Sequence, residues 1–196
     1  MKDCTLAFIG AGNMARSLIG GLVNNGFPAQ SIQVADHNAE ALQSLAALYP
    51  VQTFTDNNAA IADADVVVLA VKPQQLQKVV RDMAPHWQKD KLMVSIAAGI
   101  RLDDLDRWLG VDNAAIVRAM PNTPSLVQAG ATALCANTHA SNEQHELAES
   151  ILRAVGLALW VKDEQQMDAV TALSGSGPAY FFLVIEAMQS AGMELG

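Results

Sequence analysis

The stretch Phe8-Ile9-Gly10-Ala11-Gly12-Asn13-Met14-Ala15 decides the fold of this 196-residue chain. It has the form Gly-x-Gly-x-x-Ala and directly follows a short apolar run that is typical of a β-strand. In such a turn the first glycine permits a tight bend, and the second lets the backbone approach a pyrophosphate. The following helix, which we expect to run to about Asn24, offers its free N-terminal amides to an anion. We therefore predict a dinucleotide site here rather than a merely structural bend.

Outward from this turn, short apolar runs alternate with helical patterns up to about residue 160. The strand candidates are Thr5–Ile9, Ile32–Ala35, Val51–Phe54, Val66–Val71, Leu92–Ile96, Ala115–Ala119, Ala131–Cys135 and Leu157–Val161. Helical patterns occur at Asn38–Leu48, Asn58–Ala62, Gln74–Ala84 and Ser141–Ala154, with capping residues predicted at Asn38 and at Ser141 with Gln144. This alternation predicts an α/β fold of the Rossmann type, a doubly wound and mostly parallel sheet with helices on both faces.

The pattern changes at the polar stretch Lys-Asp-Glu-Gln-Gln, residues 162–166. Beyond it, Met167–Leu173 and Pro178–Leu195 are predicted to be helices, and no further strand follows. Apolar residues cover more than one face of the last helix, so it needs more than one surface to pack against. We expect a dinucleotide-binding domain over residues 1–163 and the beginning of a helical domain over residues 164–196, or a helix that packs on another subunit.

Composition and charge exclude several classes of protein. Apolar residues make up 51% of the chain and charged residues 16%, which is incompatible with disorder. The longest aliphatic run, Val66–Val71, is far shorter than the roughly 20 residues of a bilayer span, so we expect no membrane contact. A net charge of −8 without a basic stripe argues against nucleic-acid binding. No residues have metal-ligand spacing, and we predict no metal site.

The two cysteines and the four histidines are assigned no catalytic role. Cys4 and Cys135 lie in apolar runs, where we expect buried thiols of a cytoplasmic protein. The histidines, which lie outside the motifs described below, are expected at the surface: His37, His86, His139 and His145.

The type of dinucleotide depends on the end of the second predicted strand. Asp36 stands 26 residues after Gly10, near the place where an acid binds the ribose 2′-hydroxyl of NAD. The same carboxylate would repel the 2′-phosphate of NADP, although His37, Asn38 or a nearby cation could offset this. These residues equally fit an ordinary turn and helix cap. Both NADH and NADPH therefore stay open.

Four later segments occur in order after the glycine turn. They are Ala70-Val71-Lys72-Pro73, Ser95-Ile96-Ala97-Ala98-Gly99, Arg118-Ala119-Met120-Pro121-Asn122-Thr123-Pro124, and the stretch from Asp168 to Tyr180 with its Ser-Gly-Ser-Gly-Pro-Ala-Tyr core. The whole series closely resembles the pyrroline-5-carboxylate reductase family, from about residue 5 to the end. The resemblance implies reduction of the cyclic imine Δ1-pyrroline-5-carboxylate to L-proline with NADPH or NADH, the last step of proline biosynthesis. It also implies a homodimer or higher homo-oligomer.

Motif positions and the resemblance together give a set of candidate site residues. Those expected to bind the cofactor are Gly10, Ala11, Gly12, Asn13, Met14, Asp36, Asn57, Ala70, Val71, Lys72, Pro73, Ala97, Ala98, Gly99, Asn122 and Thr123. Those expected in the substrate pocket are Thr171, Ser174 and Ser176, because helix N-terminal amides and hydroxyls suit a carboxylate.

Several of these positions also have plainer interpretations. Lys72 fits a solvated residue at a strand end, Asn57 fits a helix cap, and the segment Ser174–Pro178 fits a kink between two helices. Arg118, inside a predicted strand, is better explained as one half of a structural ion pair.

Chain length sets the last expectation. Family members continue for about 70 further residues, by the usual size of such a domain, with a Ser-Pro-Gly-Gly-Thr type segment that helps to bind the substrate carboxylate. We therefore expect this chain to bind dinucleotide but to reduce the imine poorly, as a fragment or as a natural short form. Two alternatives are a related dehydrogenase for another small acid, which usually has a catalytic lysine that residues 164–196 lack, and a non-catalytic nucleotide-binding module.

Overall fold

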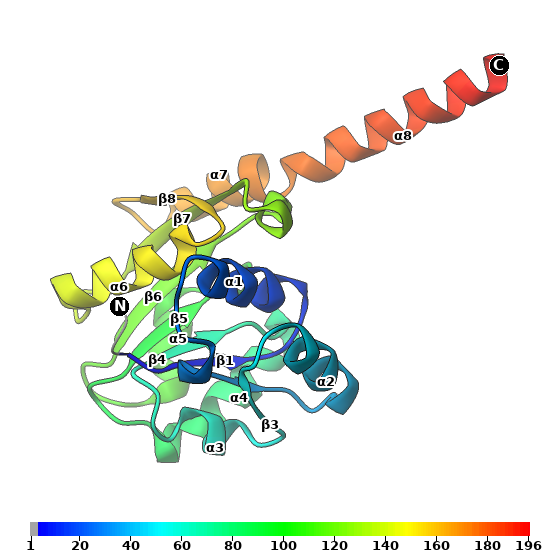
Figure 1. Ribbon diagram of the computed structural model, residues 1–196. Helices are drawn as coiled ribbons and strands as arrows, with labels where there is room; N and C mark the ends of the chain where they lie inside the picture. The colour runs from blue at the N-terminus through cyan, green and yellow to red at the C-terminus, as the bar shows by residue number, and fades with distance from the viewer. Residues whose placement is uncertain (1–3) are drawn as a thin grey trace.

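A computed structural model describes residues 4–196 and shows one eight-stranded sheet with helices on both faces (Figure 1). The strands are β1 Leu6–Ile9, β2 Ile32–Ala35, β3 Gln52–Phe54, β4 Val66–Leu69, β5 Leu92–Ser95, β6 Ala115–Met120, β7 Gly130–Ala136 and β8 Gly156–Trp160. Their order across the sheet is β3-β2-β1-β4-β5-β6-β7-β8, and every pair is parallel except β6 with β7. The predicted mostly parallel, doubly wound α/β fold is confirmed.

Eight helices accompany the strands in the part of the chain that is described. They are α1 Asn13–Asn24, α2 Ala39–Leu48, α3 Asn57–Ile61, α4 Pro73–Met83, α5 Leu102–Leu109, α6 Asn142–Arg153, α7 Gln166–Val170 and α8 Gly177–Leu195. The caps predicted at Asn38 and at Ser141 with Gln144 are confirmed. The cap interpretation of Asn57 is wrong, because the Asp56 side chain accepts the hydrogen bond from the Asn58 backbone and Asn57 is already helical.

Alternate residues of the strands point to the two faces of the sheet. On one face, Leu6 and Phe8 of β1 pack with residues of α1, α2 and α6. On the other, Ala7 and Ile9 pack with residues of α3, α4 and α5 and with Met167 of α7. All four β1 side chains are fully buried. The sheet is therefore covered on both sides, and its strand ends are held at fixed positions.

The two cysteines differ in burial. Cys135 in β7 is buried, as expected, and burial raises the pKa of its thiol, with the nearby Glu164 carboxylate acting in the same direction. Cys4 is only half-buried, because it precedes the first strand.

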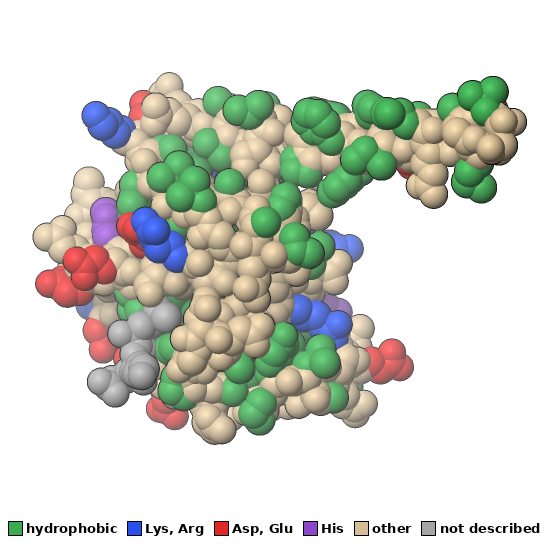
Figure 2. Space-filling model, turned by 45° about the horizontal axis from the view of Figure 1, so that its top comes forward, with side chains coloured by type: hydrophobic (Ala, Val, Ile, Leu, Met, Phe, Trp, Pro, Cys, Tyr) green, Lys and Arg blue, Asp and Glu red, His purple; other side chains and the backbone are tan. Residues whose placement is uncertain are grey.

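Residues Gln166–Leu195 form one nearly continuous helical arm, whose α8 part extends away from the sheet (Figure 1). The predicted break at Ser174–Pro178 is instead a π-helical turn, Thr171–Gly175, because the Ser176 N–H donates to the Thr171 carbonyl at 2.8 Å and keeps the backbone helical. Exposed apolar side chains line α8 (Figure 2), among them Phe181, Phe182, Leu183, Ile185 and Met188. By length and composition Gln166–Leu195 could cross a membrane, which the length of aliphatic runs did not reveal.

Candidate cofactor and substrate site

The carboxyl ends of β1 to β4 surround a hollow of about 560 Å³. It lies where the strand order reverses between β1 and β4, which is the usual ligand position of open parallel sheets. Seven of the predicted cofactor residues line it: Gly10, Gly12, Asp36, Asn57, Ala70, Val71 and Lys72. Ala11, Asn13, Met14 and Pro73 adjoin these residues in the chain without lining the hollow.

The glycine turn is built as its motif requires. Gly10 has a φ of 106°, and a Cβ there would stand 2.7 Å from the Ala70 carbonyl oxygen, so only glycine fits. Gly12 caps α1, is exposed, and has nothing within 4 Å of the place where a Cβ would be. No acidic side chain occupies the first turn of α1. The amides at this helix start are therefore open to an anion, which fits the pyrophosphate of a dinucleotide.

Asp36 braces the same turn. Its Oδ2 accepts a hydrogen bond from the Ala11 N–H at 2.7 Å, and its Oδ1 accepts one from the Asn38 N–H at 2.8 Å. A carboxylate has about four acceptor positions, so both oxygens can still receive a ribose hydroxyl. The part of Asp36 in choosing between NADH and NADPH stays a prediction, with the added feature that the carboxylate also holds the glycine turn.

Cationic and polar groups complete the hollow. Lys72 is exposed at the N-cap of α4, with Pro73 as the first helical residue. His37, expected at the surface and named as a group that could offset the Asp36 charge, lies at the hollow with 87% of its side chain exposed and Nδ1 3.4 Å from Asp36 Oδ1. Within residues 4–196, no three His, Cys, Asp or Glu side chains are placed to hold a metal ion.

A second group of predicted residues lies along the same edge, outside the lining of the hollow. Ala97, Ala98 and Gly99 follow β5, and Gly99 has a φ of 76°. Asn122 and Thr123 follow β6. Such strand ends face the ligand side of the sheet.

Asn122 connects this edge to the helical arm. Its Nδ2 donates to Ser174 Oγ at 3.2 Å, while its Oδ1 accepts from the Ala131 N–H at 2.9 Å. Gly175 approaches so closely that a Cβ on it would stand 2.7 Å from Met120 Cε. The strand-end loop and the π-helical turn are therefore in contact.

Two of the predicted substrate residues, Thr171 and Ser174, lie on this π-helical turn, a feature that often marks functional sites, and Ser176 directly follows it. The Thr171 hydroxyl donates to the Met167 carbonyl at 2.7 Å, so its hydrogen is committed inside the helix. Ser174 reaches Asn122, and half-buried Ser176 stands at the start of α8, whose first turn has no acidic residue. The Ser176 N–H donates to the Thr171 carbonyl and the Ala179 N–H to the Ser176 carbonyl, so a carboxylate at the start of α8 would depend on the Ser176 hydroxyl more than on helix amides.

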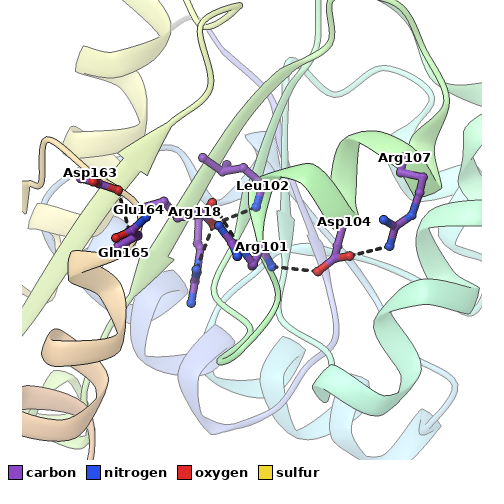
Figure 3. Close-up of polar contacts among 8 residues, drawn as sticks. All are labelled: Arg101, Leu102, Asp104, Arg107, Arg118, Asp163, Glu164 and Gln165. Atoms are coloured by element: carbon purple, nitrogen blue, oxygen red, sulfur yellow. Dashed lines mark hydrogen bonds and ion pairs between the residues drawn. The ribbon is translucent and has the colours of Figure 1, made fainter.

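The ion pair predicted for Arg118 is confirmed, and its partner is Glu164 (Figure 3). Arg118 Nη1 lies 2.9 Å from Glu164 Oε1, and the two side chains are 4% and 14% exposed. Sequence reasoning missed Glu164, because it belongs to a polar stretch that resembles a solvated boundary. The unmatched cation inside a strand was the available signal, since a buried arginine requires an acidic partner.

Comparison with family models covers both ends of the chain. Residues 5–99 match the model "NADP oxidoreductase coenzyme F420-dependent". Residues 164–196 match the model "Pyrroline-5-carboxylate reductase dimerisation". The first match contains the glycine turn and the second contains the helical arm.

Individual proteins resemble the chain throughout. A pyrroline-5-carboxylate reductase of Pseudomonas aeruginosa is 52% identical over 196 residues, which are 100% of this chain and 71% of that protein. One of Haemophilus influenzae is 46% identical over 191 residues, or 97% of this chain and 70% of that protein. The solved structure of a pyrroline-5-carboxylate reductase from Coxiella burnetii has a TM-score of 0.90 at 46% identity, over 98% of this chain and 72% of that one.

A second solved structure was determined with a cofactor. Plasmodium falciparum pyrroline carboxylate reductase, with NADP bound, has a TM-score of 0.87 at 28% identity, over 100% of this chain and 71% of that one. Fold, motifs and identity agree over the whole length of the chain, which therefore belongs to the pyrroline-5-carboxylate reductase family.

Proposed function

We propose that this protein reduces Δ1-pyrroline-5-carboxylate to L-proline with NADPH or NADH. The observation that most strongly supports this function is the 52% identity to the Pseudomonas aeruginosa reductase over all 196 residues. The geometry supports it, because the dinucleotide hollow and the hydroxyl-bearing π-helical turn open at the same edge of the sheet.

We expect the cofactor to be held mainly by backbone amides and less by charged side chains. The exposed Gly12 and the open amides of α1 hold the pyrophosphate, while Asp36 and Asn57 stand on the adenosine side. The small residues Ala97 to Gly99 and the pair Asn122 and Thr123 border the nicotinamide side. The cofactor supplies the hydride, and these residues set its orientation.

The substrate requires a held carboxylate and a protonated ring nitrogen. A protonated imine is a strong electrophile, so positioning in a closed site can supply most of the catalysis. This agrees with the candidate residues Ser174 and Ser176, which bring hydroxyls but no acid–base pair. The Thr171 hydroxyl donates to the Met167 carbonyl, so Thr171 can offer only an acceptor oxygen. We assign the substrate carboxylate to the start of α8, beside Ser176.

The helical arm supports a homo-oligomer. Its exposed apolar residues belong to the segment that matches the reductase dimerisation model. We propose that a second copy of the chain covers α8, in a dimer or a larger assembly. The buried Cys135 thiol supports a reducing compartment such as the cytoplasm.

The test separates binding from chemistry. Calorimetric titration with NADPH and with NADH measures the cofactor affinity, and loss of reduced-nicotinamide absorbance with the cyclic imine measures turnover. The Pseudomonas aeruginosa reductase serves as the reference. Binding together with imine-dependent oxidation that is slower than that of the reference is the expected result. Absence of binding for both nucleotides would contradict the cofactor assignment, and binding without oxidation above background would contradict the substrate assignment.

A further inference from the structure

Glu164 joins three parts of the molecule from the link between β8 and α7 (Figure 3). Its Oε1 accepts hydrogen bonds from the Leu102 N–H at 2.8 Å and from Arg118 Nη1 at 2.9 Å. Its Oε2 lies 3.8 Å from Arg101 Nε. Because Glu164 and Arg118 are both largely shielded from water, either one alone would be an uncompensated charge. The carboxylate is therefore fixed in place.

Each partner of Glu164 is continuous with a segment of the proposed site. Arg118 lies on β6, which leads directly into Asn122 and Thr123. Leu102 begins α5, three residues after Gly99, and its N–H is one that the helix itself leaves without a partner. A carboxylate at this helix start is also favoured by the helix dipole. One side chain thus contacts the end of the loop that follows β5 and a residue of β6 two positions before that strand ends.

The chain beyond Glu164 carries the third segment. It passes through Met167, which is fully buried against the sheet, and reaches the π-helical turn with Ser174, which Ser176 directly follows. There the Asn122–Ser174 hydrogen bond makes a second attachment. The arm is fastened by an ion pair at its base and by two neutral hydrogen bonds of Ser174, one from Asn122 and a long one of 3.5 Å to the Ala131 carbonyl. Because Glu164 makes the charged attachment, we expect a change at Glu164 to shift the turn relative to both loops.

We propose that Glu164 is a positioning residue for the reduction: it sets the distance between the nicotinamide-side loop 97–99 and the substrate residues of the π-helical turn, without touching either ligand. The proposal rests on the proposed function. A misplacement of about 1 Å can lower the rate of an oriented reaction by about 100-fold, so the expected loss is in kcat. Cofactor affinity, which we expect to come mainly from the distant glycine turn and hollow, should change less than kcat.

The first experiment compares Glu164→Gln with the parent chain by hydrogen–deuterium exchange without any ligand. The amide keeps an oxygen for the Leu102 N–H and removes the charge that faces Arg118. Glu149→Gln is the matched control. Like Glu164, Glu149 accepts a hydrogen bond from an arginine and a second one from another residue, here Trp160, but it lies on α6, outside the two segments that are measured. We expect loss of protection in both 97–102 and 166–176 for Glu164→Gln and in neither for the control. Parent-like protection in either segment would overturn the proposal.

The second experiment measures kinetics with the imine and NADPH. For Glu164→Gln we expect kcat to fall roughly 10- to 100-fold, with a smaller change in the Kd for NADPH. An unchanged kcat would overturn the proposal. A parent chain that shows no reduction contradicts the proposed function instead, and the exchange data then decide the position of Glu164 separately.

A double variant, Arg118→Met with Glu164→Leu, covers the case in which Glu164→Gln fails to fold. Replacing both members of a buried ion pair by apolar residues commonly preserves stability. The leucine has no acceptor for the Leu102 N–H, so that hydrogen bond is absent in the double variant. We expect a parent-like Tm, unprotected amides in 97–102 and 166–176, and a low kcat. Return of both protection and kcat to parent values would show that Glu164 only neutralises Arg118, and would overturn the proposal.

Discussion

The sheet region and the helical arm use apolar residues in opposite ways. Phe8 in β1 is 0% exposed, whereas Phe182 in α8 is 56% exposed. The sheet region covers its strands with its own helices, while α8 presents phenylalanine, leucine and isoleucine side chains to solvent. The sheet region therefore holds its own core, whereas α8 leaves its apolar side chains uncovered, and we propose that a second copy of the chain covers them. Four predictions test this contrast.

The largest expected effect comes from a matched pair of truncations. Phe8→Ala removes a fully buried ring and should lower the free energy of unfolding by about 3–5 kcal/mol. Phe182→Ala should change it by less than about 0.5 kcal/mol in dilute, monomeric protein, because its ring is already largely hydrated. Urea denaturation followed by circular dichroism measures both. Equal losses for the two variants would refute the contrast.

The next prediction concerns self-association through α8. Phe182→Glu places an unpaired charge on the surface that we expect a second copy to cover, and should weaken association by about 2–5 kcal/mol. Sedimentation velocity over a range of protein concentrations measures the change. Gln43→Glu adds the same charge to an exposed position of α2 and should leave association unchanged. An arm variant that associates as well as the parent would argue against a partner copy on this face.

The glycine turn allows folding and cofactor binding to be separated. Gly10→Ala forces a Cβ against the Ala70 carbonyl at a positive φ and should destabilise the fold by about 1–3 kcal/mol. Gly12→Ala meets no atom within 4 Å, so it should leave stability intact and weaken NADPH binding by obstructing the pyrophosphate. Thermal melts and calorimetry with NADPH distinguish the two effects. Destabilisation by Gly12→Ala would contradict the assigned geometry.

The smallest expected effect lies in the choice of cofactor. Asp36→Ser removes the carboxylate near the ribose and should shift preference toward NADPH by roughly 1–3 kcal/mol. Asp36→Asn removes the charge but keeps an acceptor for the Ala11 N–H. It therefore distinguishes the effect of the charge on cofactor choice from the effect of the hydrogen bond that holds the glycine turn. The ratio of the two dissociation constants is the measurement. A constant ratio across parent and both variants would exclude Asp36 from cofactor selection.

Local patterns predicted the elements well, because they depend on neighbouring residues. The ends of all eight predicted strands lie within two residues of the observed ends. The helix α5 escaped prediction, although Leu102, Leu105 and Leu109 have helical spacing and Gly110 ends the helix in a left-handed conformation. It is short, and its start is stabilised by Glu164, which is 62 residues away.

The direction of strand β7 and the partner of Arg118 could not be predicted, because neither depends on neighbouring residues in the sequence. The antiparallel run of β7 cannot be read from an apolar pattern, which has no polarity along the chain. The pairing of Arg118 with Glu164 spans 46 residues, so the ion pair could be expected while its partner could not be named. Candidate residues at the strand ends were placed at one edge because parallel strands share that edge. Only the structure separates those in the hollow from those beside it.

The central place of β1 has a consequence for how the chain folds. Leu6 pairs with Ile32 on one side and with Val66 on the other. The first ladder closes a short loop, whereas the second must wait until β4 is present, and closing the longer loop costs more chain entropy. Until then an apolar strand carries an open edge, which is a hazard for aggregation. Closure of that edge also creates the reversal where the dinucleotide sits. The nucleotide therefore stabilises the finished sheet by mass action, and we expect it to slow unfolding without accelerating the early steps of folding.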